Sequence, residues 1–208
     1  MRDKIRLPSA FTKMETYISI LRGVNVGGQA QIKMEALKKS YEKLYLSNVA
    51  TYIQSGNVIF DAGETDTRII ENRICSQIEA DFGVKVPVIV LTWGSLKKII
   101  EENPFTKDPG KDLTFLHVTF LAETPKQYDK ESIEDKKQGD EEIRFSEKAI
   151  YLYCPHGYGR TKLNNNFLEK KLKVGATTRN WKPRWSCCGW LADWFRMSPL
   201  QGSGKMIT

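Results

Sequence analysis

The chain has 208 residues, of which 40% are hydrophobic and 27% charged, and its formal net charge is +7. This ordinary globular composition excludes a chain that is disordered throughout, and no apolar run approaches the roughly 20 residues of a membrane-spanning helix. The length accommodates one large domain or two small ones.

The compartment and the cofactor content are predicted from the start of the chain and from its cysteines. Residues 1–13 lack the apolar stretch of a secretory signal, so a cytoplasmic location and no membrane partner are expected. The four cysteines show no CxxC spacing and the chain has only two histidines, which disfavours a zinc site. Neither a metal nor a cofactor is expected.

The positive charge is concentrated at the two ends of the chain. Residues 1–13 and residues 182–208 each contribute +3, so residues 14–181 carry only +1. A basic surface is typical of proteins that bind phosphate backbones. Because the body of this chain is almost neutral, nucleic acid is a less favoured partner than a small anionic molecule.

The first half of the chain predicts strands and helices in alternation. Runs of β-branched and apolar residues that predict strands occupy residues 16–24, 48–53, 57–60 and 84–91. Amphipathic spacing that predicts helices occupies residues 34–45 and 67–82. The resulting order, βαββαβ, is that of a ferredoxin-like domain.

The second half of the chain repeats this pattern after a turn-rich connector. A helix is predicted at 93–103, and the sequence PFTKDPGKD places a boundary at 104–112. Strands are then predicted at 113–121, 142–146 and 149–154, and helices at 124–137 and 163–172. The expected fold class is α+β, with two ferredoxin-like (α-β plait) subdomains, residues 14–104 and 112–181, packed together and built on antiparallel sheets.

Four segments resemble a known family. They are YISILRGVNVGGQAQIKMEALKKSYEKL, NVATYIQSGNVIF, YLYCPHGYGRTKLNNNFLEKKL and ATTRNW. From about Glu15 to Trp181 the chain resembles the bacterial family catalogued as domain of unknown function 1697. The resemblance implies two packed α-β plait subdomains, and it implies no known activity.

The chain departs from the family pattern at both ends. The family usually begins near the strand predicted at Thr16, so Met14 is a candidate for the natural start, and residues 1–13 are interpreted as an upstream extension. The ATTRNW motif normally leads into a leucine-rich helix, whereas the tryptophan-rich tail 182–208 follows it here. An altered reading frame near Lys182 and genuine divergence both explain this change.

Two loops combine glycines with basic residues just before a predicted helix. Main-chain N–H groups and a helix N-terminus favour an anion, so both loops are candidates for binding a phosphate or a carboxylate. Neither loop has a complete G-x-G-x-x-G or Walker pattern. The alternative is a pair of structural turns, in which Asn25 bonds its own loop and Thr161 caps the following helix. The candidate ligand-binding residues are Arg22, Asn25, Gly27, Gly28 and Lys33 in the first loop and Arg160, Lys162 and Asn164 in the second.

Two further polar segments are candidates for the same site. Gln54, Ser55 and Asn57 lie at a predicted hairpin tip, and Arg179 offers a bidentate contact to a carboxylate or phosphate. The alternatives are a hairpin whose side chains cap its own backbone and, for Trp181, packing in the core. Because no histidine is near Ser55 and no acid and base pair is evident, catalytic residues cannot be named from the sequence, and whether the chain is an enzyme is left open.

Three functions fit these observations. The favoured one is binding, with turnover left open, of a small phosphorylated or anionic ligand between the two lobes. The alternative is binding of RNA or single-stranded nucleic acid on a sheet face, through Tyr151, Tyr153 and Phe115. The third is a structural or protein-partner role that uses the aromatic tail. The oligomeric state is not predicted.

Overall fold

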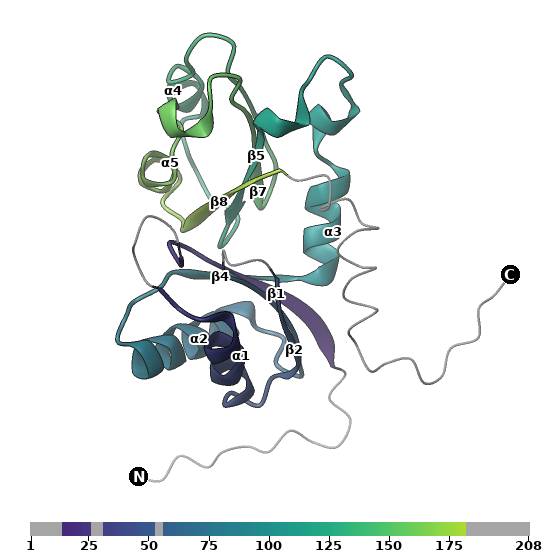
Figure 1. Ribbon diagram of the computed structural model, residues 1–208. Helices are drawn as coiled ribbons and strands as arrows, with labels where there is room; N and C mark the ends of the chain where they lie inside the picture. Colours follow the sequence, from purple (N-terminus) through teal and green to yellow (C-terminus); the bar gives the residue numbers. More distant parts are fainter. Residues whose placement is uncertain (1–13, 26–30, 53–55, 182–208) are drawn as a thin grey trace, which may run out of the picture.

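The computed structural model describes residues 14–25, 31–52 and 56–181. These residues form two lobes that lie one above the other, with one helix running alongside both (Figure 1). None of the helices in this part of the chain is long and apolar enough to cross a membrane.

The first lobe is a four-stranded antiparallel sheet covered on one face by two helices (Figure 1). Its elements are β1 (Glu15–Leu21), α1 (Met34–Glu42), β2 (Ser47–Tyr52), β3 (Asn57–Ala62), α2 (Thr67–Phe82) and β4 (Val88–Thr92). The strand order is β2-β3-β1-β4. Helix α1 ends at Glu42, earlier than predicted, and Tyr45 lies outside it, with a left-handed φ of 59° and a side chain that is 93% exposed.

The second lobe repeats this arrangement with strand order β6-β7-β5-β8. Its elements are β5 (Leu116–Leu121), α4 (Lys130–Glu134), β6 (Glu142–Phe145), β7 (Ala149–Tyr153), α5 (Asn165–Leu172) and β8 (Ala176–Asn180). Short 3-10 turns occupy Pro104–Lys107, Leu113–Phe115 and Tyr158–Arg160. Strand β8 was not predicted, because its sequence ATTRN is polar at an edge of the sheet. The predicted fold class, α+β with two ferredoxin-like subdomains, is confirmed.

The two lobes share one hydrophobic core. Successive side chains of a strand point to opposite faces, so Tyr17 and Leu21 of β1 pack under α1 and α2, whereas Ile18 and Ile20 point to the other lobe. This shared core consists of Ile18, Ile20, Ile59, Ile89, Leu91, Leu96, Ile99, Ile100, Phe105, Leu116, Val118, Phe120, Ala149, Tyr151 and Trp181. The central strands are therefore buried on both faces, which explains their continuous apolar sequences.

Helix α3 (Trp93–Glu101) connects the lobes and forms one wall of the shared core. Its buried side chains are Leu96, Ile99 and Ile100. The helix is capped at its N-terminus by Thr92, whose hydroxyl accepts a hydrogen bond from the N–H of Ser95. The Tyr151 hydroxyl of β7 donates a 2.8 Å hydrogen bond to the Ile99 carbonyl, which ties the helix to the second sheet.

Asp81 of α2 joins the two helices of the first lobe. Its carboxylate accepts hydrogen bonds of 2.6 Å from Lys43 and from Ser40 of α1, and these bonds lower the pKa of Asp81 to about 2. An unfolded aspartate titrates near 3.9, so the stabilisation is complete above about pH 4 and is lost as the pH falls toward 2.

The change Asp81→Asn is therefore expected to lower the melting temperature at pH 7 and to have a smaller effect at pH 3. Melting curves of the wild type and the variant at both pH values test this. Asp135→Asn, at an exposed position, serves as the control. An Asp81→Asn effect that is equally large at the two pH values would contradict the expectation.

Candidate functional site

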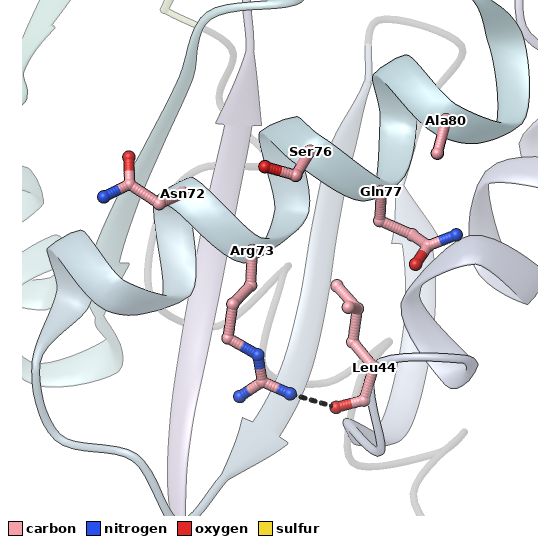
Figure 2. Close-up of a pocket in the computed structure, with 6 residues that line it drawn as sticks. All are labelled: Leu44, Asn72, Arg73, Ser76, Gln77 and Ala80. Atoms are coloured by element: carbon pink, nitrogen blue, oxygen red, sulfur yellow. Dashed lines mark hydrogen bonds between the residues drawn. The ribbon is translucent and has the colours of Figure 1, made fainter. Parts of the chain in front are cut away.

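A groove of about 490 Å³ lies between helix α2 and the turn after α1 (Figure 2). It is lined by Leu44, Asn72, Arg73, Ser76, Gln77 and Ala80. The Arg73 guanidinium lies across it and donates a 2.6 Å hydrogen bond to the Leu44 carbonyl. None of the candidate residues that the structure describes lines this groove.

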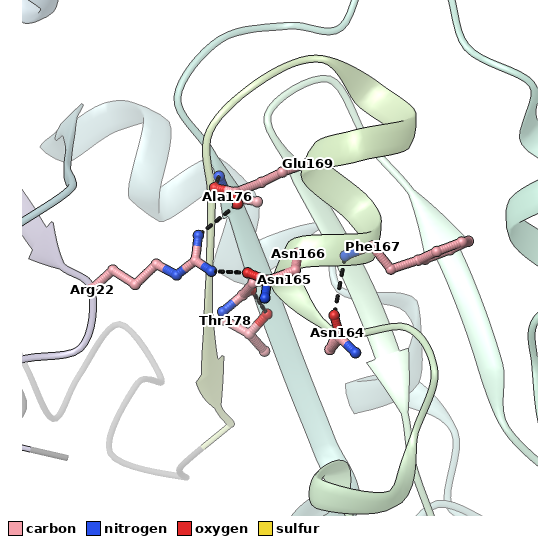
Figure 3. A network of polar contacts seen from close by, with 8 residues as sticks. All are labelled: Arg22, Asn164, Asn165, Asn166, Phe167, Glu169, Ala176 and Thr178. Atoms are coloured by element: carbon pink, nitrogen blue, oxygen red, sulfur yellow. Dashed lines mark hydrogen bonds and ion pairs between the residues drawn. The ribbon is translucent and has the colours of Figure 1, made fainter. Parts of the chain in front are cut away.

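The predicted site residues lead instead to the boundary between the lobes. Arg22 follows β1 in the first lobe and extends to α5 in the second (Figure 3). Its Nη1 forms a 2.6 Å ion pair with Glu169, and its Nη2 donates a hydrogen bond to the Asn166 side-chain oxygen. The side chains of Arg22 and Glu169 are 26% and 29% exposed, so water still reaches this contact.

Arg179 of β8, in the second lobe, extends to residues of the first lobe. Its guanidinium donates hydrogen bonds to the Leu21 carbonyl, to the Asn57 side-chain oxygen and to the Thr178 carbonyl. Burial lowers the pKa of Arg179 to about 10, so the side chain is still charged at neutral pH. We call the region defined by Arg22, Asn57, Asn166, Glu169 and Arg179 the seam.

Glu169 also protects an edge of the second sheet. Its second oxygen accepts a 2.9 Å hydrogen bond from the N–H of Ala176 at the start of β8 (Figure 3). In the first lobe Glu71 of α2 makes the same kind of contact, at 2.8 Å, with the N–H of Val90 in β4. Burial raises the pKa of Glu71. In each lobe a helix carboxylate therefore satisfies a donor of the edge strand, and in the second lobe it also holds Arg22.

The N-terminus of α5 lies beside the seam and is capped by Asn164. The Asn164 side chain accepts a 3.1 Å hydrogen bond from the N–H of Phe167 (Figure 3). The expectation that Thr161 caps this helix is wrong, because the Thr161 hydroxyl accepts from Leu163 in the preceding turn. Thr178 of β8 donates a 2.6 Å hydrogen bond to the Asn165 side chain, which fixes the helix start to the sheet edge.

Tyr158 brings a buried hydroxyl to the same region. Its ring stacks on His117 with a centroid separation of 4.8 Å. Its hydroxyl is buried near Thr178 and Asn165 but makes no hydrogen bond of ordinary geometry with the described residues. Burial raises the pKa of Tyr158, and the neighbouring Thr178 and Asn165, followed by the charge of Arg22, partly offset this effect. The phenol is therefore a neutral donor at physiological pH.

His117 is a packed residue of the second sheet. It is 4% exposed, and its Nδ1 lies 3.0 Å from the Phe115 carbonyl. Burial lowers the pKa of His117, so the ring is neutral at physiological pH. Within the described part of the chain, no three histidine, cysteine, aspartate or glutamate side chains are placed to hold a metal ion together.

The other predicted site residues have different outcomes. The Asn25 amide makes two 2.9 Å hydrogen bonds with the main chain of Ile32, so it closes its own loop, as the structural alternative proposed. Lys33, Arg160 and Lys162 are exposed and form no ion pair with the residues that the structure describes. Gly27, Gly28, Gln54 and Ser55 lie outside the described residues.

Sequence reasoning missed Glu169 and Asn166, the partners of Arg22. The signal that would have found them is their spacing of three residues on one face of a helix, directly after the polar GYGRTKLNN segment. It also missed Tyr158 as a donor, because an exposed tyrosine and a buried one look the same in a loop sequence.

The sheet face proposed to stack nucleic-acid bases is covered. Tyr151 is 2% exposed in the shared core, so the expectation that it is available for stacking is wrong. Tyr153 is half-buried between Phe105 and Phe115, and its ring centroid lies 6.3 Å from that of each phenylalanine. The ammonium group of Lys111 lies over the Tyr153 ring. The sequence correctly predicted that Tyr151 and Tyr153 lie on the same face of strand β7. That face, however, is covered by the first lobe and by α3.

Trp181 is 7% exposed and packs in the shared core, in agreement with the structural alternative. The tail at 182–208, on which the protein-partner hypothesis depended, lies outside the described residues.

Comparison with known proteins gives a family and a fold. The family model described as "Protein of unknown function (DUF1697)" matches residues 14–151. The conserved bacterial protein SP0830 from Streptococcus pneumoniae is structurally similar, with a TM-score of 0.62, 20% sequence identity, and coverage of 87% of this chain and 99% of that chain. At this identity the similarity shows the fold alone. Among curated proteins, none matches the chain.

Proposed function

Because the chain belongs to the DUF1697 family of proteins of unknown function, its role has to be inferred from its own side chains, and we propose that it binds a small phosphorylated or otherwise anionic molecule at the seam. The observation that carries this function is the convergence of four polar segments that are far apart in the sequence.

Each of the four segments contributes at least one side chain to the seam. Arg22 comes from the first loop, Asn57 from the hairpin, Asn166 from the α5 segment and Arg179 from β8, and contacts between them join the segments. The Arg22 and Glu169 contact alone spans 147 residues of sequence. Ligand sites are commonly built in this way, from loops that a rigid scaffold brings together at an interface.

The charge at the start of α5 also favours an anion. Arg160 and Lys162 lie on the segment that leads into this helix, and both are exposed without an ion pair to the described residues. A helix N-terminus carries partial positive charge, which adds to that of the two side chains. Lys33 holds the corresponding position before α1, where it is the N-cap residue.

The Tyr158 hydroxyl supplies a neutral donor to the same region. A buried hydroxyl without a partner costs about 1 to 3 kcal/mol, so a ligand oxygen or a water at this point would stabilise the fold. It adds a hydrogen-bond donor to Arg22 and to the cations before α5, and charged and neutral donors together are what a phosphate or carboxylate group binds.

The double change Arg160→Ala with Lys162→Ala is expected to weaken ligand binding about tenfold or more, because it removes two positive charges and leaves the contacts of Arg22 in place. The measurement is a thermal-shift panel of nucleotides, sugar phosphates, coenzymes and polyphosphates at low salt. A ligand at 100 times its dissociation constant stabilises the wild type by about 2.7 kcal/mol. For a chain of this size that is a shift of several degrees, since about 1 kcal/mol moves the midpoint by roughly 2 to 4 °C.

The matched control is Lys136→Ala with Lys137→Ala, which removes the same charge from exposed positions after α4. If both double variants lose affinity equally, the binding is a general effect of charge and not of the seam. A panel that is flat for the wild type would overturn the proposed function, and a shift with RNA alone would favour the nucleic-acid alternative.

A further inference from the structure

We infer that Asn166 and Glu169 occupy the place of the ligand on Arg22, so that a phosphate-type oxyanion binds Arg22 in competition with helix α5. This inference rests on the proposed function and concerns the regulation of the same site, through competition between the ligand and helix α5. In the absence of ligand, the protein supplies its own substitute for the anion.

The geometry of Arg22 is that of an arginine holding a bidentate ligand. Its two terminal nitrogens each bond one oxygen, Nη1 to the Glu169 carboxylate and Nη2 to the Asn166 amide (Figure 3). The two oxygens come from residues three apart on one face of α5. A phosphate presents two oxygens to the same fork of N–H groups, with the same sign of charge.

The contact is also weak enough to be exchanged. Arg22 and Glu169 are each more than a quarter exposed, and an ion pair that water reaches adds little to stability. Arg179 differs, because it is more deeply buried and its partners include main-chain carbonyls. The seam therefore combines a fixed connection through Arg179 with an exchangeable one through Arg22.

Loss of Arg22 does not leave Glu169 without a hydrogen bond. Its other oxygen still accepts from the N–H of Ala176. Glu71 makes the equivalent contact with Val90 in the first lobe and forms no ion pair with a described residue, so a carboxylate in this position is compatible with the fold. An incoming oxyanion thus displaces Glu169 without creating a buried, unpaired charge.

The test compares binding of inorganic pyrophosphate to the wild type and two variants by titration calorimetry at fixed low salt. Glu169→Gln keeps an oxygen for Ala176 but removes the charge that competes for Arg22, so the affinity is expected to rise about tenfold. Asn166→Ala, at an exposed position on the helix, frees the other nitrogen and is expected to raise the affinity by a smaller factor. Glu71→Gln, the matched change in the first lobe, is expected to leave it unchanged.

The two ideas fail in different ways. If the wild type binds pyrophosphate and neither Glu169→Gln nor Asn166→Ala binds it more tightly, the competition is refuted while the proposed function stands. Weaker binding by Glu169→Gln also refutes it, because Glu169 would then position Arg22 for the ligand. If no protein in the series binds pyrophosphate, the competition and the phosphate-type ligand fall together.

Discussion

Replacing Phe120 by alanine is expected to destabilise both lobes together, by about 3 to 5 kcal/mol. Phe120 belongs to β5 of the second lobe, is 0% exposed and packs in the shared core, where residues of both sheets and α3 meet. The cavity left by the ring removes contacts from both lobes at once. Because the shared core joins the two sheets, the protein is expected to unfold in one transition.

Urea unfolding followed by circular dichroism gives the free-energy change, and hydrogen exchange shows where it acts. Amides of β3 and of β7 are expected to lose protection by the same free energy in the Phe120→Ala variant. Ile69→Ala, at a position that is 45% exposed, serves as the control and is expected to change stability by less than about 0.5 kcal/mol. If β3 keeps its protection while β7 loses it, the lobes are independent and this view of the core is wrong.

Replacing Arg179 by alanine is expected to cost about 2 to 3 kcal/mol of stability, the second-largest effect we expect. The change leaves the Leu21 carbonyl and the Asn57 side chain without this donor, and both residues are buried. Arg179→Lys retains the charge but not the fork of donors, so it is expected to recover only part of the loss.

Arg73→Ala is the matched control for Arg179→Ala, since Arg73 also donates to a main-chain carbonyl but is exposed. Urea unfolding of the three variants beside the wild type measures the difference. A loss for Arg179→Ala no greater than that for Arg73→Ala would show that the connection from β8 to the first lobe adds little to the fold.

The order of the elements was predictable because hydrophobic period and turn residues act locally. Helix α2 was predicted at its observed bounds, since its apolar spacing is bounded by a capping Asp66 and by Gly83 in the left-handed conformation. Helix α1 was predicted to extend to Tyr45, because this tyrosine fits the apolar spacing of the helix. In the structure its side chain is exposed to solvent.

The burial of Tyr151 and the contacts of the arginines were not predictable from the sequence. Alternation along a strand shows that a sheet has two faces, but it does not show that another lobe covers the second face. Arg22 and Arg179 were recognised as polar residues beside turns, but their partners lie far away in the sequence. Such pairs depend on how two lobes pack, which no local pattern records.

The most direct test of the seam as a ligand site is a hydrogen-exchange footprint of the full chain with and without pyrophosphate. Binding at the seam is expected to slow exchange at the amides of Arg22 to Asn25 and of Tyr158 to Asn166, and to leave those around Arg73 in the groove on α2 unchanged. Slower exchange around Arg73 with no change near Arg22 and Tyr158 would contradict a ligand site between the lobes.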